Sequence, residues 1–182
     1  MALIESTKIQ LGSDLPKFTL PNTNNKNFSH TDLMGPKGLL VVFTCNHCPY
    51  AIAVWSRLIT ISKEAKKLGI ETVAINPNIN PKYPDDSPDK MKEKIKEWNI
   101  PFEYLIDKSQ DVARNFDAQC TPDIYLYNSQ QKLVYHGRID DNWQDASKVT
   151  KEELKDAILN LSQGKEISKD QKTSMGCSIK WL

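Results

Sequence analysis

The sequence predicts an α/β fold in which a mixed central sheet carries helices on both faces, together with an N-terminal hairpin and an inserted helix. Residues 39–43 form an uninterrupted apolar run, which is typical of a strand buried on both faces. Apolar residues with helical spacing follow over 51–59, and 70–75 form a second apolar run, which completes a β-α-β unit. A chain of 182 residues can bury one full core. We therefore expect a single domain over residues 1–182, with 164–182 as a C-terminal tail.

The elements around this unit follow from local patterns. Polar residues 22–27 separate an opening stretch from Phe28, which predicts a short edge hairpin. After the helix over 51–59, another helix is expected to run to about Leu68, where Gly69 ends it.

An insertion follows the second strand. Residues 76–89 include four prolines, which predict a stiff, irregular loop. Ser87 is suited to cap a helix that begins at Pro88 and ends near Trp98.

The C-terminal half completes the sheet. Thr150 and Glu153 have the spacing of a capping box for a last helix that ends near residue 161. The other expected elements are a strand over 102–106, a short helix over 109–116, and a hairpin formed by 124–127 and 133–136.

The charge, hydropathy and cysteine content of the chain argue against several classes of function. Twenty-four basic and 23 acidic residues give a net charge of +1, which argues against nucleic acid or an acidic membrane as partner. The first residues lack the pattern of a signal peptide, and no stretch is long and apolar enough to span a bilayer, so we expect a soluble, cytoplasmic protein. Four cysteines are too few for a disulfide scaffold, which directs attention to reactive or metal-binding thiols.

Two of these cysteines form a CxxC pair at the junction between the first buried strand and its helix. A helix N-terminus stabilises a thiolate and lowers a cysteine pKa from about 8.5 to roughly 3.5–7.5. We therefore expect Cys45 to be the nucleophile. Cys48, one helical turn further on, is then the resolving thiol that attacks a mixed disulfide.

The two residues between the cysteines, Asn46 and His47, are expected to tune this couple. His47 can favour the Cys45 thiolate through a hydrogen bond or partial charge, or it can simply be a solvated loop residue. A CxxC pair can also be half of a zinc site. Zinc needs two further ligands, and the sequence has no second CxxC and no HxxxH.

A second signal lies at Thr121-Pro122, just before the predicted strand over 124–127. Proline cannot extend a central ladder, so Pro122 is expected in a turn.

This combination of features resembles the thioredoxin superfamily and, more closely, its peroxiredoxin-like branch related to AhpC/TSA and redoxin proteins. The segments that carry the resemblance are 43–50 (FTCNHCPY), 83–87 (YPDDS), 120–123 (CTPD), 137–141 (GRIDD) and 176–181 (GCSIKW).

The resemblance implies a thioredoxin-like fold and a cis Pro122 that faces the CxxC. It also implies that the backbone of Thr121 pairs with an extended partner peptide near Cys45. The implied activity is thiol-disulfide exchange with a protein or small-molecule disulfide or dithiol. No cofactor is expected, and the oligomeric state stays open.

The chain departs from the family pattern in two places. Peroxiredoxins place a threonine three positions before the reactive cysteine, whereas Thr44 is adjacent to Cys45. Thioredoxins carry a buried aspartate on the strand before the CxxC, whereas residues 39–42 are all apolar. A thiol peroxidase is therefore the alternative enzyme, and a metal-binding protein that uses Cys45, Cys48 and His47 is the second alternative.

Two further cysteines have two interpretations each. Cys120 can accept a disulfide from Cys45, or it can be a small buried apolar residue. Cys177 can be a third redox thiol, or it can anchor the tail together with Ile179 and Trp181.

Overall fold

A five-stranded mixed sheet forms the centre of the computed structural model, which describes residues 3–182. Its strands, in spatial order, are β6 (Glu103–Ile106), β5 (Ile70–Asn76), β4 (Gly38–Phe43), β8 (Asp123–Asn128) and β9 (Leu133–His136). Strands β4, β5 and β6 are parallel, whereas β8 runs antiparallel to both β4 and β9. The predicted mixed sheet, with the 39–43 run at its centre, is confirmed.

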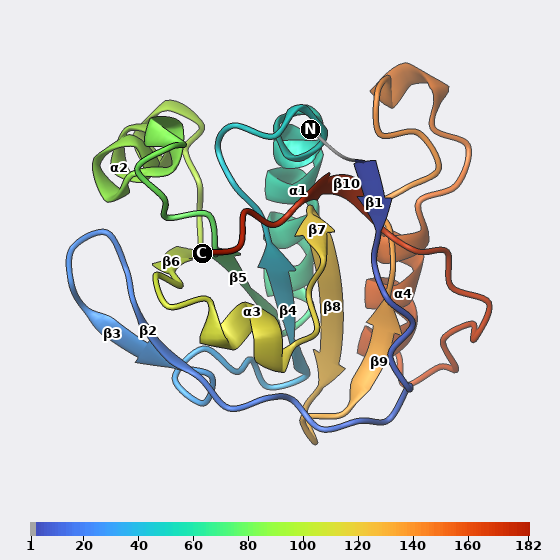
Figure 1. The fold of residues 1–182 in the computed structure, drawn as a ribbon. Coiled ribbons are helices and arrows are strands. Elements are labelled where there is room, and N and C mark those ends of the chain that lie inside the picture. The colour runs from blue at the N-terminus through green and yellow to red at the C-terminus, as the bar shows by residue number, and fades with distance from the viewer. Residues whose placement is uncertain (1–2) are drawn as a thin grey trace.

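The sheet is covered on both faces because successive side chains of a strand point to opposite sides. Leu40 and Val42 pack into one core with α1, α2 and α4, whereas Leu39 and Val41 pack into another with α3. These helices are α1 (Pro49–Lys67), α2 (Pro88–Glu97), α3 (Asp111–Asn115) and α4 (Glu153–Ser162). Figure 1 shows α1 and α4 behind the sheet and α3 in front of it. The continuous apolar run in β4 thus reflects burial from both sides.

Helix α1 differs from the prediction of two helices, because it is continuous. Nothing between 51 and 68 interrupts it: the segment has neither proline nor glycine, and buried side chains continue from Leu58 to Ile61 and Ala65. Gly69 follows with φ of +84°, the left-handed conformation that ends many helices, as predicted.

Two additions flank this core. The predicted N-terminal hairpin is present as β2 (Thr19–Pro21) and β3 (Asn27–Ser29). The insertion after β5 contains the short 3-10 helix η1 (Pro84–Asp86) and then α2, whose N-cap Ser87 accepts the Lys90 N–H at 3.4 Å. A second 3-10 helix, η2 (Ala146–Lys148), precedes α4.

The predicted capping box of α4 is wrong. Glu152 is the N-cap residue and makes no side-chain cap bond. The Thr150 hydroxyl instead donates to Asp141, and Glu153 forms an ion pair with Arg138 at 2.5 Å. Both side chains are thus used to fix the loop after β9.

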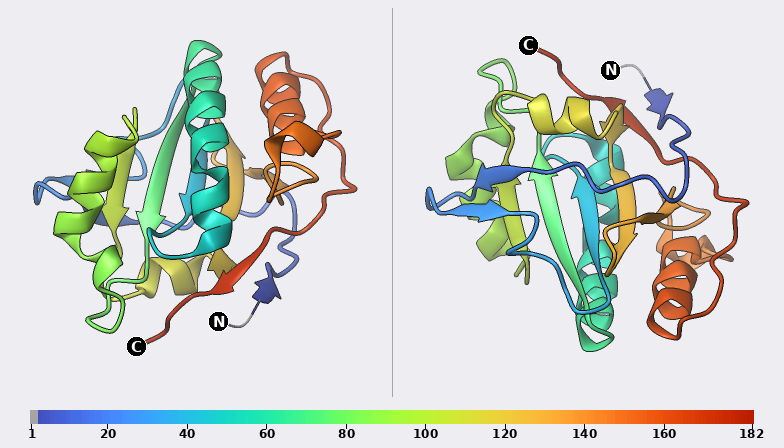
Figure 2. Two further views of the ribbon diagram at one scale, coloured as in Figure 1. Left: turned by 90° about the horizontal axis from the view of Figure 1, so that it is seen from above. Right: turned by 90° about the horizontal axis from the view of Figure 1, so that it is seen from below.

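The C-terminal segment folds back on the molecule instead of forming a tail. Strand β10 (Met175–Ser178) lies between β1 (Leu3–Glu5) and β7 (Cys120–Thr121) in a three-stranded antiparallel sheet. Seen from above in Figure 2, α1 and α4 lie on one side of the central sheet, and β1 and β10 on the other. The first and last strands of the chain thus close over the same end of the molecule.

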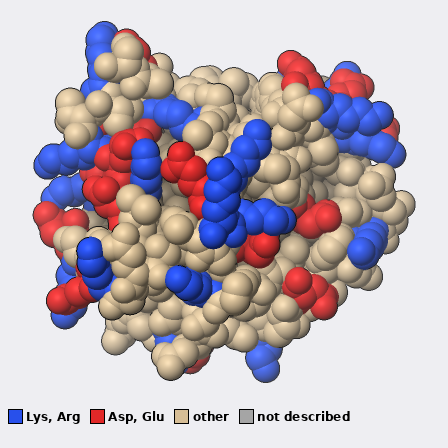
Figure 3. Space-filling model, turned by 180° about the vertical axis from the view of Figure 1, so that it is seen from behind, with Lys and Arg blue, Asp and Glu red and all other residues tan. Residues whose placement is uncertain are grey.

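The surface agrees with the balanced composition. Figure 3 shows basic and acidic side chains interspersed on the face seen from behind. Among residues 3–182, no helix is both long and apolar enough to cross a bilayer.

Candidate active site

The CxxC pair occupies the junction between β4 and α1, as predicted. Cys48 is the N-cap residue of α1, with Pro49 in the first helical position, and the side chains of both cysteines are fully buried. All four cysteines of the chain lie within the described residues, and each is present as a thiol.

Thr121 contacts both sulfur atoms. Its hydroxyl oxygen lies 3.2 Å from Cys45 Sγ, and its carbonyl oxygen accepts the Cys48 thiol at 3.1 Å. The Thr121-Pro122 peptide bond is cis, which confirms the conformation implied by the resemblance. One residue of β7 therefore holds the reactive pair from the side opposite α1.

The ionisation of the pair differs from the expectation for Cys45. A hydrogen bond from the Cys45 thiol, helped by bonds to Cys177 and the Ala51 N–H, lowers the pKa of Cys48 to about 5 despite its burial. Burial, with the Cys48 bond and the charge of Asp86, raises the pKa of Cys45 well above its usual range. The difference arises because the Cys48 sulfur accepts hydrogen bonds from Cys45, Cys177 and the Ala51 N–H, whereas the Cys45 thiol donates to Cys48.

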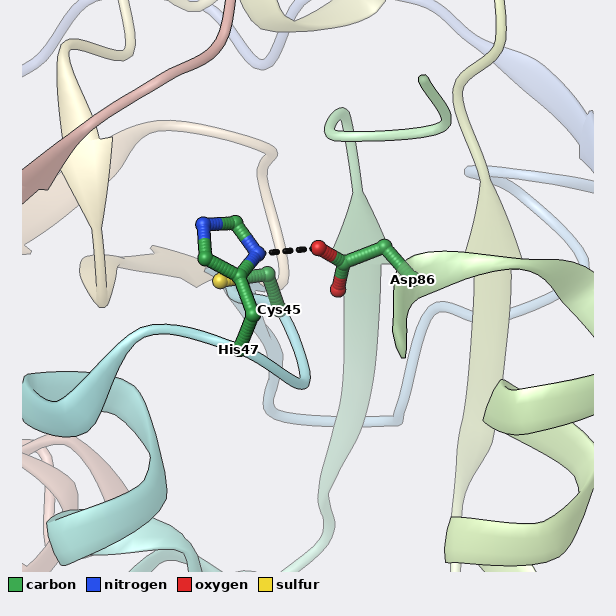
Figure 4. A group of neighbouring side chains, drawn as sticks. All are labelled: Cys45, His47 and Asp86. Carbon is green, nitrogen blue, oxygen red and sulfur yellow. Dashed lines mark hydrogen bonds and ion pairs between the residues drawn. The ribbon is translucent and has the colours of Figure 1, made fainter. Parts of the chain in front are cut away.

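A carboxylate that sequence reasoning missed faces the CxxC loop from the insertion. Asp86 is fully buried in η1 and accepts the Asn46 N–H at 2.6 Å and the Asn76 amide at 3.1 Å. Its other oxygen bonds to His47 Nδ1, the contact drawn in Figure 4. Two signals in the sequence pointed to it: the absence of a carboxylate on residues 39–42 and the family-like segment 83–87.

His47 is held by the insertion and is not a solvated loop residue. Its ring stacks on Tyr83 with centroids 4.7 Å apart, and its side chain is only 9% exposed. Nδ1 is directed at Asp86, whereas Nε2 is buried without a hydrogen-bond partner in the described structure. The expected support of a Cys45 thiolate therefore does not come through Nδ1.

Asn46 joins the loop to the insertion. Its side-chain amide donates to the Asp85 carbonyl at 2.8 Å, and its side-chain oxygen accepts from the Tyr104 hydroxyl at 3.1 Å. The residue therefore sets the loop conformation and does not touch either sulfur through these bonds.

A metal ion could be held by one group of side chains here. Ligand atoms of Cys45, His47 and Asp86 lie within 4.8 Å of one another. Figure 4 shows the three side chains. Cys48, which the sequence-based alternative included, is not in this group. Asp86 already accepts from three protein donors, so a metal would compete with bonds that hold the loop.

Strand β10 occupies the edge of β7 that was expected to receive a partner peptide. Cys177 is paired with Thr121 in the antiparallel ladder, so the Thr121 backbone is not open to a partner in this conformation. Burial and a hydrogen bond to Cys48 raise the pKa of Cys177 to about 12. The structure thus brings Cys177 into the active site.

Cys120 lies next to this site but faces away from it. Neighbouring residues of a strand point to opposite sides, and since Thr121 faces Cys45, Cys120 does not. Its thiol instead bonds to the Pro122 carbonyl at 3.5 Å, and burial raises its pKa. This environment is that of a small buried apolar residue.

Comparison with known proteins places this site in a family context. The family model described as the AhpC/TSA family matches residues 11–136. The thiol-disulfide oxidoreductase ResA of Bacillus subtilis (strain 168) is 28% identical over 126 residues, which span 69% of this chain and 66%, just under two thirds, of that protein.

Two solved structures are also similar. An uncharacterized conserved protein from Geobacillus kaustophilus superposes with a TM-score of 0.95 at 37% identity, covering 100% of this chain and 97% of that one. The thioredoxin domain of a thiol-disulfide oxidoreductase from Bacteroides vulgatus shares the fold, with a TM-score of 0.58 at 19% identity over 71% of this chain and 89% of that one. The protein thus has a thioredoxin-like fold, and it belongs to the AhpC/TSA family.

Proposed function

We propose that this protein is a thiol-disulfide oxidoreductase that works by dithiol-disulfide exchange at Cys45 and Cys48. The observation that carries the proposal is the contact of both thiols with Thr121 beside a cis-proline, at the start of a helix. The name of the B. subtilis relative supports the same activity.

The attacking thiolate arises by a short proton shift. In the reduced protein, the Cys45 thiol donates to the charged Cys48 sulfur. When this proton passes to Cys48, Cys45 becomes the thiolate, and the Thr121 hydroxyl can donate to it. Cys48 is then a thiol, which donates to the Thr121 carbonyl. Both contacts of Thr121 therefore suit the state in which Cys45 is the thiolate and Cys48 the thiol.

Exchange then proceeds in two steps. Cys45 Sγ attacks one sulfur of a partner disulfide, that bond breaks, and the leaving sulfur takes the proton held by Cys48. Cys48, again as a thiolate, attacks Cys45 Sγ in the mixed disulfide and releases the second partner sulfur. The partner is reduced by two electrons, and the protein is left with a Cys45–Cys48 disulfide.

Three other residues position the pair. Asp86 holds the backbone of Asn46 and the ring of His47, so the loop between the cysteines is fixed on both sides. We assign His47 as a positioning residue beside Cys45, because a carboxylate orients its ring and ligand atoms of the two side chains lie within 4.8 Å of each other.

The substrate class we propose is a protein disulfide, with small-molecule disulfides as the alternative. Cys45 and Cys48 are fully buried, so a protein disulfide cannot reach their sulfur atoms in this conformation. A neighbouring part of the chain must therefore move before exchange. The dependence on thiols suits a reducing compartment, and we propose a cytoplasmic location on this ground.

The test is reduction of insulin disulfides with dithiothreitol as electron donor. Wild type should accelerate the reaction, Cys45→Ser and Cys48→Ser should fall to the background rate, and Cys120→Ser, which alters a buried thiol outside the pair, should stay active. Hydroperoxide consumption without insulin reduction would instead support the thiol peroxidase. Stoichiometric zinc in gently purified protein, bound at the expense of redox activity, would support the metal-binding alternative.

A further inference from the structure

We propose that Cys177 is a third redox thiol of this centre, brought to Cys48 by a C-terminal strand that occupies the site of a partner peptide. The proposal depends on the proposed function, because it requires a Cys45–Cys48 disulfide to exchange with. It adds a residue from a segment that lies 129 positions away from Cys48 in the sequence.

The position of β10 is the first observation. Thr121 precedes the cis-proline, and the residue paired with it across the ladder is Cys177. An extended partner that paired with Thr121 would place its own residue at this point. The chain thus offers one of its own cysteines where a substrate cysteine would lie.

The approach of the two strands requires a glycine next to this cysteine. A Cβ on Gly176 would lie 2.1 Å from the Thr121 carbonyl oxygen and 3.2 Å from Pro122 Cδ. Any other residue at 176 would therefore push β10 away from the cis-proline. Glycine at 176 allows the backbone to pack directly against the active site.

The contact with Cys48 is the second observation. Both the thiol and the backbone N–H of Cys177 form hydrogen bonds to Cys48. Cys45, Cys48 and Cys177 pack in one buried cluster with Ala51, and Cys177 is only 2% exposed. Cys48 thus contacts the other two thiols of the cluster, which is the arrangement that stepwise disulfide exchange requires.

The residues after Cys177 hold it in this place. Gln110 is buried at the start of α3, and its side-chain amide forms hydrogen bonds to the backbone of the last residues of the chain. The bonds are Ile179 N–H to Gln119 O (2.9 Å), Lys180 N–H to Asn78 Oδ1 (2.8 Å), Gln110 Nε2 to Lys180 O (2.9 Å) and Leu182 N–H to Gln110 Oε1 (2.8 Å). Anchoring of the tail and a redox role for Cys177 are therefore compatible.

The exchange balances without a further oxidant. Starting from the Cys45–Cys48 disulfide, Cys177 Sγ attacks Cys48 Sγ and forms the Cys48–Cys177 bond. The bond between Cys45 and Cys48 breaks, its electron pair stays on Cys45 Sγ, and the proton lost by Cys177 ends on Cys45. Cys45 is again a thiol, while the protein keeps one disulfide.

Cys120 provides the internal control. It lies on the same strand as Thr121 and is as deeply buried as Cys45, yet its thiol bonds to a carbonyl oxygen and not to another sulfur. Proximity of a cysteine to the cis-proline therefore does not by itself predict exchange, and the two thiols are expected to behave differently.

The test is disulfide mapping after oxidation with oxidised glutathione and an acid quench. Trypsin leaves Cys45 and Cys48 together on peptide 38–57, Cys120 on 115–132 and Cys177 on 173–180. Wild type should give both the internal 38–57 disulfide and a linked 38–57/173–180 pair. Cys177→Ser should lose the linked pair, and Cys120→Ser should keep it.

Cys45→Ser isolates the proposed contact, because Cys48 and Cys177 are then the two thiols that remain in the cluster. The linked pair should become its main oxidised species, with near-ultraviolet circular dichroism showing that the variant is folded; Cys45→Ala serves as a second form. If Cys48 and Cys177 of Cys45→Ser can still be alkylated under conditions that convert wild type fully to the 38–57 disulfide, the inference about Cys177 is wrong. The proposed function is then unaffected. If wild type forms no disulfide within 38–57, the proposed function itself fails.

Discussion

Two segments from distant parts of the chain close on the CxxC loop, and they act on different parts of it. The insertion brings Asp86 to the two residues between the cysteines, through the Asn46 N–H and the His47 ring. The C-terminal strand brings Cys177 to the sulfur of Cys48. The first contact fixes the conformation of the loop, and the second changes the chemistry of the thiols.

The two segments also differ in how firmly they are attached. Asp86 is fully buried and accepts from three donors, each of which would lose its partner if the carboxylate were removed. Strand β10 has only four residues and is covered on its outer side by the three residues of β1. We therefore expect changes in the insertion to affect stability most, and changes in β10 to affect access and redox behaviour.

The largest effect is expected for Asp86→Ala. Breaking a buried, hydrogen-bonded charge costs about 3–5 kcal/mol, since its partners are left unpaired inside the protein. Urea unfolding should show this loss of unfolding free energy. Asp85→Ala is the matched control, because the Asp85 side chain is exposed and only its backbone carbonyl contacts Asn46. Equal losses for the two variants would contradict the role assigned to Asp86.

An intermediate effect is expected on the ionisation of Cys48. Cys45→Ala removes the donor that contributes most to the lowered pKa, and a hydrogen bond to a charged group is worth about 1.5–3 kcal/mol, or about one to two pH units. Thiolate absorbance should therefore titrate near pH 5 in wild type and higher in Cys45→Ala. Cys177→Ala should move the midpoint less, because the backbone N–H of residue 177 is retained.

The lowered pKa of Cys48 also makes the stability of the fold depend on pH. Because the pKa of Cys48 is lowered in the folded protein, its thiolate stabilises the fold fully above its ordinary pKa of about 8.5, and this contribution is lost as the pH falls toward about 5. The difference in unfolding free energy between wild type and Cys48→Ser should shrink over that interval. A titration near pH 5 that persists in Cys48→Ser would place the thiolate elsewhere.

A smaller effect on stability than that of Asp86→Ala is expected for Gly176→Ala. The added Cβ meets the backbone carbonyl of Thr121, so β10 must shift outward, at a cost of about 1–3 kcal/mol. The more specific result is faster alkylation of Cys177 in the native protein. Met175→Ala, at an exposed neighbour on the same strand, should leave that rate unchanged. Unaltered alkylation in Gly176→Ala would show that β10 does not depend on this close approach.

Much of the fold could be predicted from local patterns. Residues 39–43 and 70–75 had to be buried strands, and Gly69 and Ser87 marked helix ends that the structure shows. The capping box at Thr150 and Glu153 failed because their side chains bond to Asp141 and Arg138, partners that local spacing cannot reveal.

The site was predicted where its residues are neighbours in sequence or carry the family resemblance. The spacing gave Cys45 and Cys48, and the resemblance gave the cis Pro122, but the ionisation of the pair depends on which sulfur accepts the hydrogen bonds. Asp86 and Cys177 reach the loop through tertiary packing, from segments 39 or more residues away from the residues they contact. Their roles could not be deduced from spacing along the chain.

The most direct test of the central claim is the equilibrium of wild type with a series of glutathione redox buffers, followed by peptide mapping. The account predicts a two-electron couple, with the disulfide of peptide 38–57 formed first and lost in Cys45→Ser. Its potential would then fix the direction of electron flow, since thioredoxin lies near about −270 mV and a strong oxidant such as DsbA near about −120 mV. If all four cysteines stay alkylatable across the whole series, this protein is not a thiol-disulfide oxidoreductase.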